Sequence, residues 1–267
     1  MKWKQLFQDN KPIIGMIHVP ALPGTPGSKL SMDEILQVVL REVNIYTKEN
    51  LDSIMIENMH DIPYLNQSVG PEITAFMSVI GARIKQETHI PCGMQILASA
   101  NRESLAASLA AGFDYIRAEG FVFAHVADEG YTESCAGELL RYRKYIGGEH
   151  ILVLTDIKKK HSAHTITSDV SIGETAHAAE FFLSDGLIVT GSATGIEPAE
   201  MDLREVKKAS DLPVIIGSGI TSDNIRKYWN LADGFIIGSY FKEDGLWSNT
   251  VSSDRVHKFM LEVERLR

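Results

Sequence analysis

Short apolar runs rich in β-branched residues alternate with longer amphipathic segments along the whole chain. Runs of this kind, bounded by glycine, proline and polar residues, are typical of buried strands. The pattern predicts eight strands: Ile13–His18, Ser53–Glu57, Pro91–Leu97, Tyr115–Glu119, Ile151–Ile157, Gly186–Thr190, Val214–Gly217 and Gly234–Gly238.

The segments between these runs have helical periodicity. They predict helices over Met32–Asn50, Pro71–Glu87, Glu103–Ala111, Ala136–Ile146, Ile172–Leu183, Leu203–Ala209, Asn224–Tyr228 and Asp254–Arg267. Strands that alternate with helices imply parallel βαβ units, and eight units are the number that a closed barrel needs.

The length of 267 residues fits one such domain. We therefore predict an α/β fold, a single (β/α)8 TIM barrel over residues 1–267, with residues 1–12 as a short N-terminal extension. An open, doubly wound sheet is the main alternative, because it needs no pairing between the eighth strand and the first.

Glycine breaks follow the last two strands. Gly217-Ser218-Gly219 leads into Thr221, Ser222 and Asp223, which suit a helix N-cap, and Gly238-Ser239 ends the eighth strand. Backbone N–H groups left free by a glycine turn at a helix start bind anions, most often phosphate. The sequence thus predicts a phosphate-binding site after strands 7 and 8, with Gly191-Ser192 after strand 6 as a further wall.

Polar residues stand where the predicted strands end. Active sites of barrels lie at the C-terminal ends of the strands, so these residues are the catalytic candidates: His18, Glu57, Arg117, Glu119, Asp156 and Lys158, with Gln95 and Thr190 beside them. Charges at the ends of buried strands are unfavourable unless they are paired or functional. An ion-pair network that merely satisfies itself is the alternative for each residue taken singly.

Other readings of these residues stay open. Glu57 and Asp156, with Glu119 and His18, could hold a divalent metal, although no ligand-spaced motif supports one. A lysine of the run Lys158-Lys-Lys160 could reach a phosphate or form a Schiff base. The segment Phe121–Cys135 is either a lid over the pocket or a surface excursion.

Composition limits the kinds of partner that we expect for this protein. The net charge of −9 and the lack of a long basic run argue against nucleic acid. No apolar stretch is long enough to span a bilayer, and no signal sequence is recognisable. Cys92 and Cys135 form no metal-spaced cluster and suit a reducing compartment. We expect a cytoplasmic protein that requires no cofactor; a homo-oligomer is compatible with the pattern, which does not decide it.

Several blocks resemble the BtpA/SgcQ group of TIM-barrel proteins. They include the run from Ile14 to Gly24, Glu57-Asn-Met-His-Asp-Ile-Pro63, Gly137–Arg143, Thr155–Ser162 and Phe241-Lys-Glu-Asp-Gly245. The resemblance implies a barrel of the ribulose-phosphate-binding type. Some relatives are linked to accumulation of photosystem I and another belongs to a bacterial sugar-metabolism cluster, so no single reaction is implied.

The chain departs from the commoner family pattern around the expected pocket. Gln95 stands where asparagine is usual, Ala98-Ser-Ala100 replaces a polar stretch, and Glu119–Phe123 replaces a segment that contains asparagine. These differences argue against a simple transfer of a photosystem role.

Two functions follow as hypotheses. The first is an enzyme acting on a small phosphorylated metabolite, such as a sugar phosphate or nucleotide, by isomerase, lyase or hydrolase chemistry. Asp156 and Glu57 would then be acid/base groups, with Arg117 and Lys158 stabilising negative charge. The second is a non-catalytic binding or assembly factor that keeps the anion site.

Overall fold

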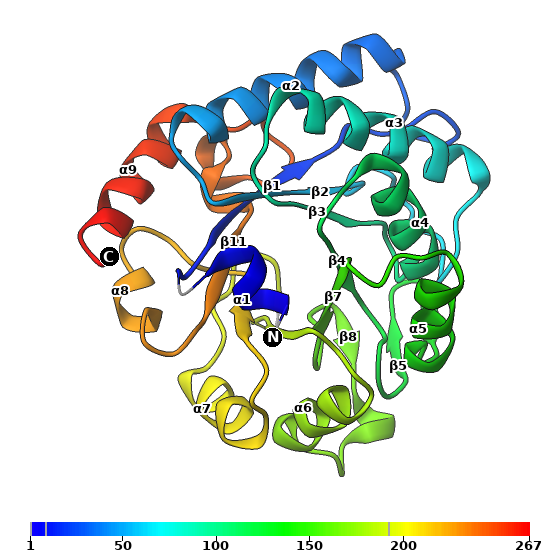
Figure 1. Ribbon diagram of the computed structural model, residues 1–267, viewed down its shortest axis with the longest axis vertical. Helices are drawn as coiled ribbons and strands as arrows, with labels where there is room; N and C mark the ends of the chain where they lie inside the picture. Colours follow the sequence, from blue (N-terminus) through cyan, green and yellow to red (C-terminus); the bar gives the residue numbers. More distant parts are fainter. Residues whose placement is uncertain (1, 9, 192) are drawn as a thin grey trace.

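The computed structural model describes residues 2–8, 10–191 and 193–267. Eight parallel strands close into a barrel in the order β1-β11-β10-β9-β7-β4-β3-β2 (Figure 1). Their bounds are β1 Ile13–His18, β2 Ser53–Glu57, β3 Cys92–Gln95, β4 Tyr115–Ala118, β7 Leu152–Asp156, β9 Gly186–Val189, β10 Val214–Ile216 and β11 Gly234–Ile237. All eight predicted strands are present.

Closure of the barrel is made by the first and last strands. Ile14 of β1 is in register with Ile236 of β11, which rules out the open sheet. Helices surround the strands, as Figure 1 shows. They are α2 Met32–Lys48, α3 Pro71–Glu87, α4 Asn101–Ala111, α5 Ala136–Tyr145, α6 Ile172–Phe181, α7 Glu200–Ala209, α8 Ile225–Tyr228 and α9 Ser253–Glu264.

Local sequence explains where the helices begin and which face they bury. α2 starts at a capping box, in which Ser31 accepts from the N–H of Glu34 and Glu34 reaches back to Ser31. Its residues Ile35, Val39 and Val43 recur at helical spacing and are buried against the barrel. α6 has the same capping arrangement at its first turn.

Alternation along the strands divides the core in two. On β1, Ile13 and Ile17 face the helices, whereas Ile14 and Met16 face the barrel interior. The strand period of two therefore predicts which side chains reach the pocket, because the same parity continues to the strand end.

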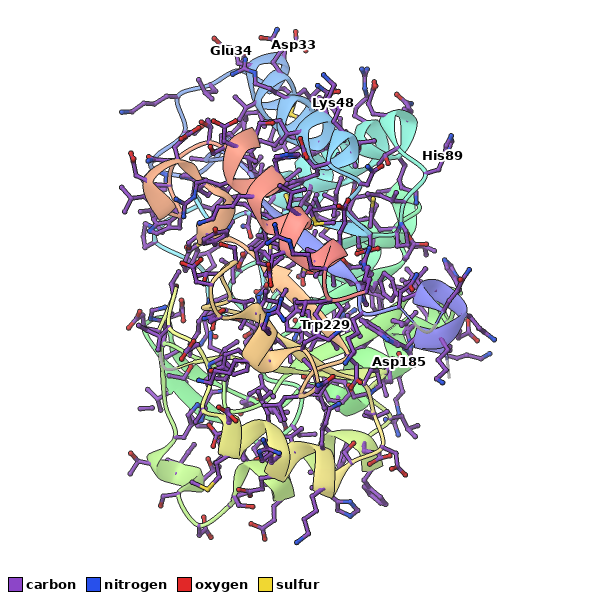
Figure 2. The ribbon with its side chains drawn as sticks, turned by 90° about the vertical axis from the view of Figure 1, so that its left-hand side faces the viewer. Asp33, Glu34, Lys48, His89, Asp185 and Trp229 are labelled. Carbon is purple, nitrogen blue, oxygen red and sulfur yellow. The ribbon has the colours of Figure 1, made fainter. Side chains whose placement is uncertain are left out.

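Residues 1–12 were predicted as a plain extension, but they contain a helix, α1 Lys2–Phe7. Trp3 and Phe7 are buried with the interior residues Tyr115 and Leu152. Figure 2 places α1 at the end of the barrel where His89 and Asp185, which precede β3 and β9, also lie. The helix therefore plugs the N-terminal end of the barrel.

The segment after β4, predicted to be either a lid or a surface excursion, contains two short strands. It forms a hairpin of β5 His125–Ala127 and β6 Gly130–Thr132, and β5 pairs with β8 Ser162–Ala163 in a small antiparallel sheet. The 3₁₀ turns η1 Thr165–Thr167, η2 Ser239–Phe241 and η3 Glu243–Gly245 complete the described elements. None of the helices in the described part of the chain is long and apolar enough to cross a membrane.

Candidate active site

A cavity of about 460 Å³ opens at the C-terminal end of the barrel. Each of the eight strands, or the loop that follows it, contributes to its wall. The size suits a small metabolite, and the location is where barrel enzymes carry out their chemistry.

Three polar side chains form a row across the first strands. His18 of β1 is in register with Glu57 of β2, and Glu57 is in register with Gln95 of β3. All three are buried and line the cavity. The buried Oε1 of Gln95 receives no hydrogen bond from any described residue. A buried polar atom without a partner inside a cavity is suited to a ligand that donates to it.

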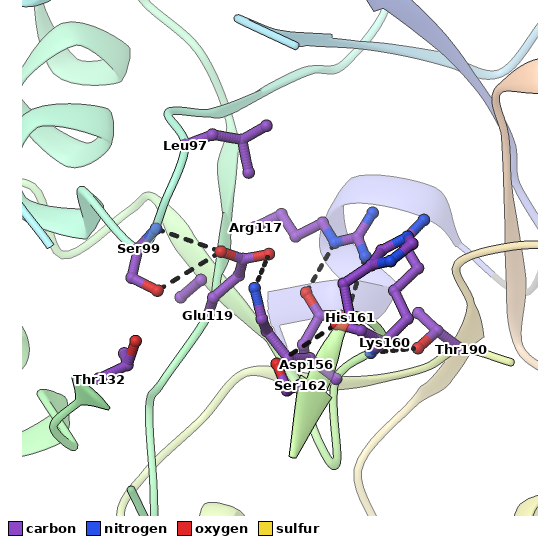
Figure 3. Close-up of polar contacts among 12 residues, drawn as sticks. Leu97, Ser99, Arg117, Glu119, Thr132, Asp156, Lys160, His161, Ser162 and Thr190 are labelled. Carbon is purple, nitrogen blue, oxygen red and sulfur yellow. Dashed lines mark hydrogen bonds and ion pairs between the residues drawn. The ribbon is translucent and has the colours of Figure 1, made fainter. Parts of the chain in front are cut away.

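The first ion pair of the site joins β4 to β7. Nε and Nη2 of Arg117 donate to the two carboxylate oxygens of Asp156, at 2.7 and 2.8 Å (Figure 3). The Asp156 side chain is fully buried, and it is Arg117, not Asp156, that lines the cavity. Asp156 therefore orients the Arg117 guanidinium from behind, and its position does not support the acid/base role predicted for it.

A second ion pair lies beside the first. Glu119 receives Nζ of Lys159 at 3.2 Å and the backbone N–H of Ser99 at 3.1 Å. Burial opposes ionisation of Glu119, but Lys159 and Arg117 outweigh it, so the pKa of Glu119 is lowered. The contact joins the segment that follows β3 to the segment that follows β4.

Glu57 and Lys160 lie beside the two ion pairs. Together with Arg117, Asp156, Glu119 and Lys159 they make up the charge ring of the site. No described residue makes a hydrogen bond or ion pair with the Glu57 carboxyl or with Nζ of Lys160. Burial raises the pKa of Glu57, and Arg117 and Lys160 only partly offset it. Burial and the nearby Arg117 lower the pKa of Lys160. An acid with a raised pKa thus faces the same cavity as an amine with a lowered pKa.

His18 is held in one tautomer. Its Nδ1 lies 2.7 Å from the carbonyl oxygen of Trp247, which can only accept, so Nδ1 carries the hydrogen. Burial and the nearby Lys242 lower the pKa of His18 to about 3. The ring is neutral at pH 7, and its Nε2 is a free base beside Gly238, where a Cβ would lie 3.6 Å from it.

The predicted phosphate loops line the cavity next to this ring. Gly217, Ser218, Gly219, Gly238 and Ser239 all contribute to the wall. Within the described residues, the backbone N–H groups of Ser218, Gly219 and Ser239 have no acceptor.

One further cation lies beside these amides. Arg255 of α9 lines the same wall, with its guanidinium 4.6 Å from the ring centroid of Tyr240. Free amides and a cation together suit a phosphate.

One of the predicted phosphate residues, Gly191, does not face the cavity. The N–H of Gly191 donates to Oγ of Ser218 at 3.0 Å, and a Cβ at Gly191 would lie 2.2 Å from the Ile196 oxygen. Gly191 is therefore packed inside the loop and does not line the cavity. Ser192 lies outside the described residues.

Lys158 does not reach the cavity. β7 ends at Asp156, and Lys158 has a positive φ of 48°, so the strand alternation that would have pointed it inward is lost. Its Nζ donates to the Thr167 carbonyl at 2.9 Å. The neighbouring Lys159 and Lys160 line the cavity in its place.

A metal site was the alternative for these carboxylates. In residues 2–8, 10–191 and 193–267, no three His, Cys, Asp or Glu side chains lie close enough together to hold a metal ion. Both Asp156 oxygens are taken by Arg117. Glu57 and Asp156 therefore do not form a shared site.

The segment 121–135 borders the cavity. Asp128 and Glu129 at the β5–β6 turn are part of the wall, and Asn66 holds the hairpin through the Tyr131 carbonyl at 2.7 Å.

Other residues that line the cavity had no signal in the sequence. Trp247, Tyr64 and Arg255 come from loops and from a helix start, where no periodicity predicts the direction of a side chain.

Comparison with known proteins shows which family the chain belongs to. The chain is 49% identical to an uncharacterised mitochondrial protein of Caenorhabditis elegans, with 98% of this chain and 97% of that protein aligned. It is 30% identical to the photosystem I biogenesis protein BtpA of Synechocystis, over 96% of this chain and 89% of that protein.

Among solved structures, thiamine phosphate pyrophosphorylase from Pyrococcus furiosus superimposes with a TM-score of 0.59 at 14% identity, covering 98% of each chain. At that identity the likeness concerns the barrel fold. The BtpA family profile matches residues 9–265, and the chain therefore belongs to the BtpA family.

Proposed function

We propose that this protein is an enzyme that acts on a small phosphorylated metabolite, a sugar phosphate or a nucleotide, by isomerase, lyase or hydrolase chemistry. The observation that carries the proposal is the pairing pattern of the charge ring. Within each of two ion pairs the charges satisfy each other, whereas Glu57 and Lys160 face the cavity and no described residue bonds their charged groups. A self-contained structural network would have no reason to leave an acid and an amine unpaired in one pocket.

The phosphate half of the proposal rests on the adjoining loops. The unbonded amides of Ser218, Gly219 and Ser239 and the guanidinium of Arg255 make one wall positive. A Cβ at Gly217 would lie 3.5 Å from Nη2 of Arg117, so a ligand held by this wall lies beside the charge ring. The name of the Pyrococcus structural neighbour also contains a phosphate compound, in keeping with this choice of ligand.

Each group then has a role. Phosphate binding to the amide wall would fix one end of the substrate, and Arg117 would stabilise negative charge that develops near it. Glu57 would act as a general acid, and the free Nε2 of His18 as a base. The buried Gln95 Oε1 would accept from a substrate hydroxyl. A cytoplasmic location remains a prediction, and a homo-oligomer remains compatible with the sequence, which does not decide it.

The test is calorimetric titration with a panel of sugar phosphates and nucleotides, each paired with its dephosphorylated form. We expect binding of at least one phosphorylated compound and much weaker binding of its partner. Arg255→Met should weaken that binding, because it removes the cation of the phosphate wall. Arg265→Met, which alters an exposed arginine of the same helical region, is the matched control.

Turnover of the bound compound is then followed in Glu57→Gln, which keeps the shape and removes the titrating group. A loss of 10²-fold or more, roughly the contribution of general acid catalysis, would support the enzyme. Binding without turnover of any compound, unchanged in Glu57→Gln, would instead favour the assembly role that the name of the Synechocystis relative suggests.

A further inference from the structure

Three consecutive lysines follow β7, and their amines have three different environments. Nζ of Lys158 is bonded to the Thr167 carbonyl outside the cavity, and Nζ of Lys159 is paired with Glu119. Lys160 lines the cavity, and no described residue bonds its Nζ. A lysine that is needed only for structure or solubility would have a partner or would extend into solvent.

The backbone around Lys160 is fixed. Its N–H donates to Oγ1 of Thr190 at 3.2 Å (Figure 3), and the next residue, His161, accepts from the N–H of Thr194 at 3.2 Å. Ser162 then enters β8, in register with Ala127 of the hairpin. The stem of Lys160 therefore starts from a rigid position, and its amine is placed within the charge ring.

The charges around Lys160 act in opposite directions. Burial and Arg117 disfavour the ammonium form, while Glu57, Asp156 and Glu119 favour it. Asp156 and Glu119 are already committed to Arg117 and Lys159. Their attraction for Lys160 is therefore largely neutralised, so burial and Arg117 prevail and the pKa of Lys160 is lowered, which favours the uncharged amine that a nucleophile needs.

We propose that Lys160 is a nucleophile that forms an imine with the carbonyl carbon of a phosphorylated aldehyde or ketone. This rests on the function proposed above and names the substrate class. In the step, the amine nitrogen bonds to the carbonyl carbon and loses a proton, and the carbonyl oxygen gains a proton to give a carbinolamine. A second proton on that oxygen lets it leave as water when the C=N bond forms. No oxidant or reductant is needed.

The surrounding groups suit both proton transfers. Glu57 lines the same cavity and holds its proton to a higher pH than an exposed glutamate, because it is buried, so it can donate to the leaving oxygen. No described residue bonds Nε2 of His18, so this neutral nitrogen can accept a hydrogen bond from the attacking amine while the proton of the amine passes to the carbonyl oxygen. A phosphate held on the amide wall would keep the carbonyl carbon in the cavity while this exchange takes place.

Borohydride trapping tests the proposal. The full-length protein is incubated with glyceraldehyde 3-phosphate or dihydroxyacetone phosphate, reduced with sodium borohydride and analysed by intact-mass and peptide mass spectrometry. We expect one secondary-amine adduct, on Lys160, that forms more slowly with the unphosphorylated glyceraldehyde. Lys160→Arg keeps the charge but has no nucleophilic amine, so adduct formation should fall at least about tenfold. Lys158→Arg, outside the cavity, is the matched control.

The outcomes separate the two proposals. Binding of either phosphorylated probe in calorimetry without an adduct, or an adduct that persists in Lys160→Arg, would overturn the imine and leave the phosphate site standing. Lys160 would then act as a cation for a second anionic group of the ligand. Failure of every phosphorylated compound to bind would overturn both.

Discussion

Single residues of this site owe their properties to the partner that each one has or lacks. Arg117 and Lys159 are neutralised by carboxylates, whereas the buried Glu57 and the half-buried Lys160 have no ion-pair partner among the described residues. His18 is neutral because burial and Lys242 oppose its charged form. Residue type alone could not tell these cases apart, since Lys159 and Lys160 are consecutive lysines and only one of them has a carboxylate partner.

At the residue scale, the pKa of His18 predicts how stability changes in acid. The pKa is about 3 in the folded protein and ordinarily about 6.5 in an unfolded chain. Below pH 6.5 the unfolded state binds the extra proton, so stability falls as the pH decreases toward 3. At pH 5 this single group should destabilise the fold by roughly 2 kcal/mol relative to pH 7, or about 4 °C in Tm.

His18→Asn removes this titration and keeps a donor near the Nδ1 position for the Trp247 carbonyl. The fall in Tm from pH 7 to pH 5, measured by calorimetry, should therefore be about 4 °C smaller in this variant. His89→Asn, which alters an exposed histidine (Figure 2), is the control. Equal falls in wild type and His18→Asn would contradict the assigned pKa.

At the scale of elements, the loop after β11 is tied to α2 by a buried ion pair. Nζ of Lys242 lies 2.8 Å from Glu42, whose other oxygen accepts the N–H of Val251 at 2.9 Å. Both side chains are almost fully buried. Trp247, whose carbonyl orients His18, belongs to this loop. The pair therefore fixes an element that the active site depends on.

Removing one partner of this pair should lower the stability of the fold, because the other charge is left buried and unpaired. Lys242→Met leaves the Glu42 carboxylate buried and unpaired, and we expect a loss of about 3–5 kcal/mol in the free energy of unfolding. The double variant Lys242→Met/Glu42→Gln removes the charge and keeps an acceptor for Val251, so it should be more stable than the single variant. Urea unfolding measures both, with Lys144→Met at an exposed pair as control. A double variant no more stable than the single one would refute this account.

Some of the elements could be predicted from the sequence and others could not. The eight barrel strands were predictable because each is a short apolar run between turn residues. The end of β3 at Gln95 was not, because Ile96 and Leu97 leave the ladder to bond Ser104 and Asn58 from other segments. α1 has too few residues for a periodic pattern, and its role is apparent only from its contact with the barrel interior.

The candidate site was predictable in position and less so in detail. Strand parity placed Arg117, Glu57 and His18 in the cavity, and glycine breaks located the amide wall. Among the three lysines after β7, strand parity favoured Lys158, but Lys159 and Lys160 line the cavity instead. The chain turns at a positive φ directly after β7, and a regular alternation cannot predict such a turn. Arg255 and Trp247 were missed because tertiary packing alone brings them to the pocket.

At the scale of the whole molecule, the two ends of the barrel divide stability from function. α1 covers the N-terminal end with apolar side chains, whereas the C-terminal end holds Glu57 and Lys160, for which the described part of the chain offers no partner. Groups that are buried without partners for the sake of a ligand lower the stability of the empty protein. Substitutions at the two ends should therefore have opposite effects.

We expect Lys160→Met to leave the Tm unchanged or raise it, because the remaining ring consists of two ion pairs and a Glu57 that is readily protonated. Trp3→Ala should lower the Tm by roughly 6 °C or more, since it opens a cavity against Phe7, whose ring centroid lies 4.4 Å away. Calorimetric scans measure both effects, and titration with a phosphorylated ligand should be altered only by Lys160→Met. A large loss of stability in Lys160→Met would mean that this lysine holds the barrel together, and the division between the two ends would then not exist.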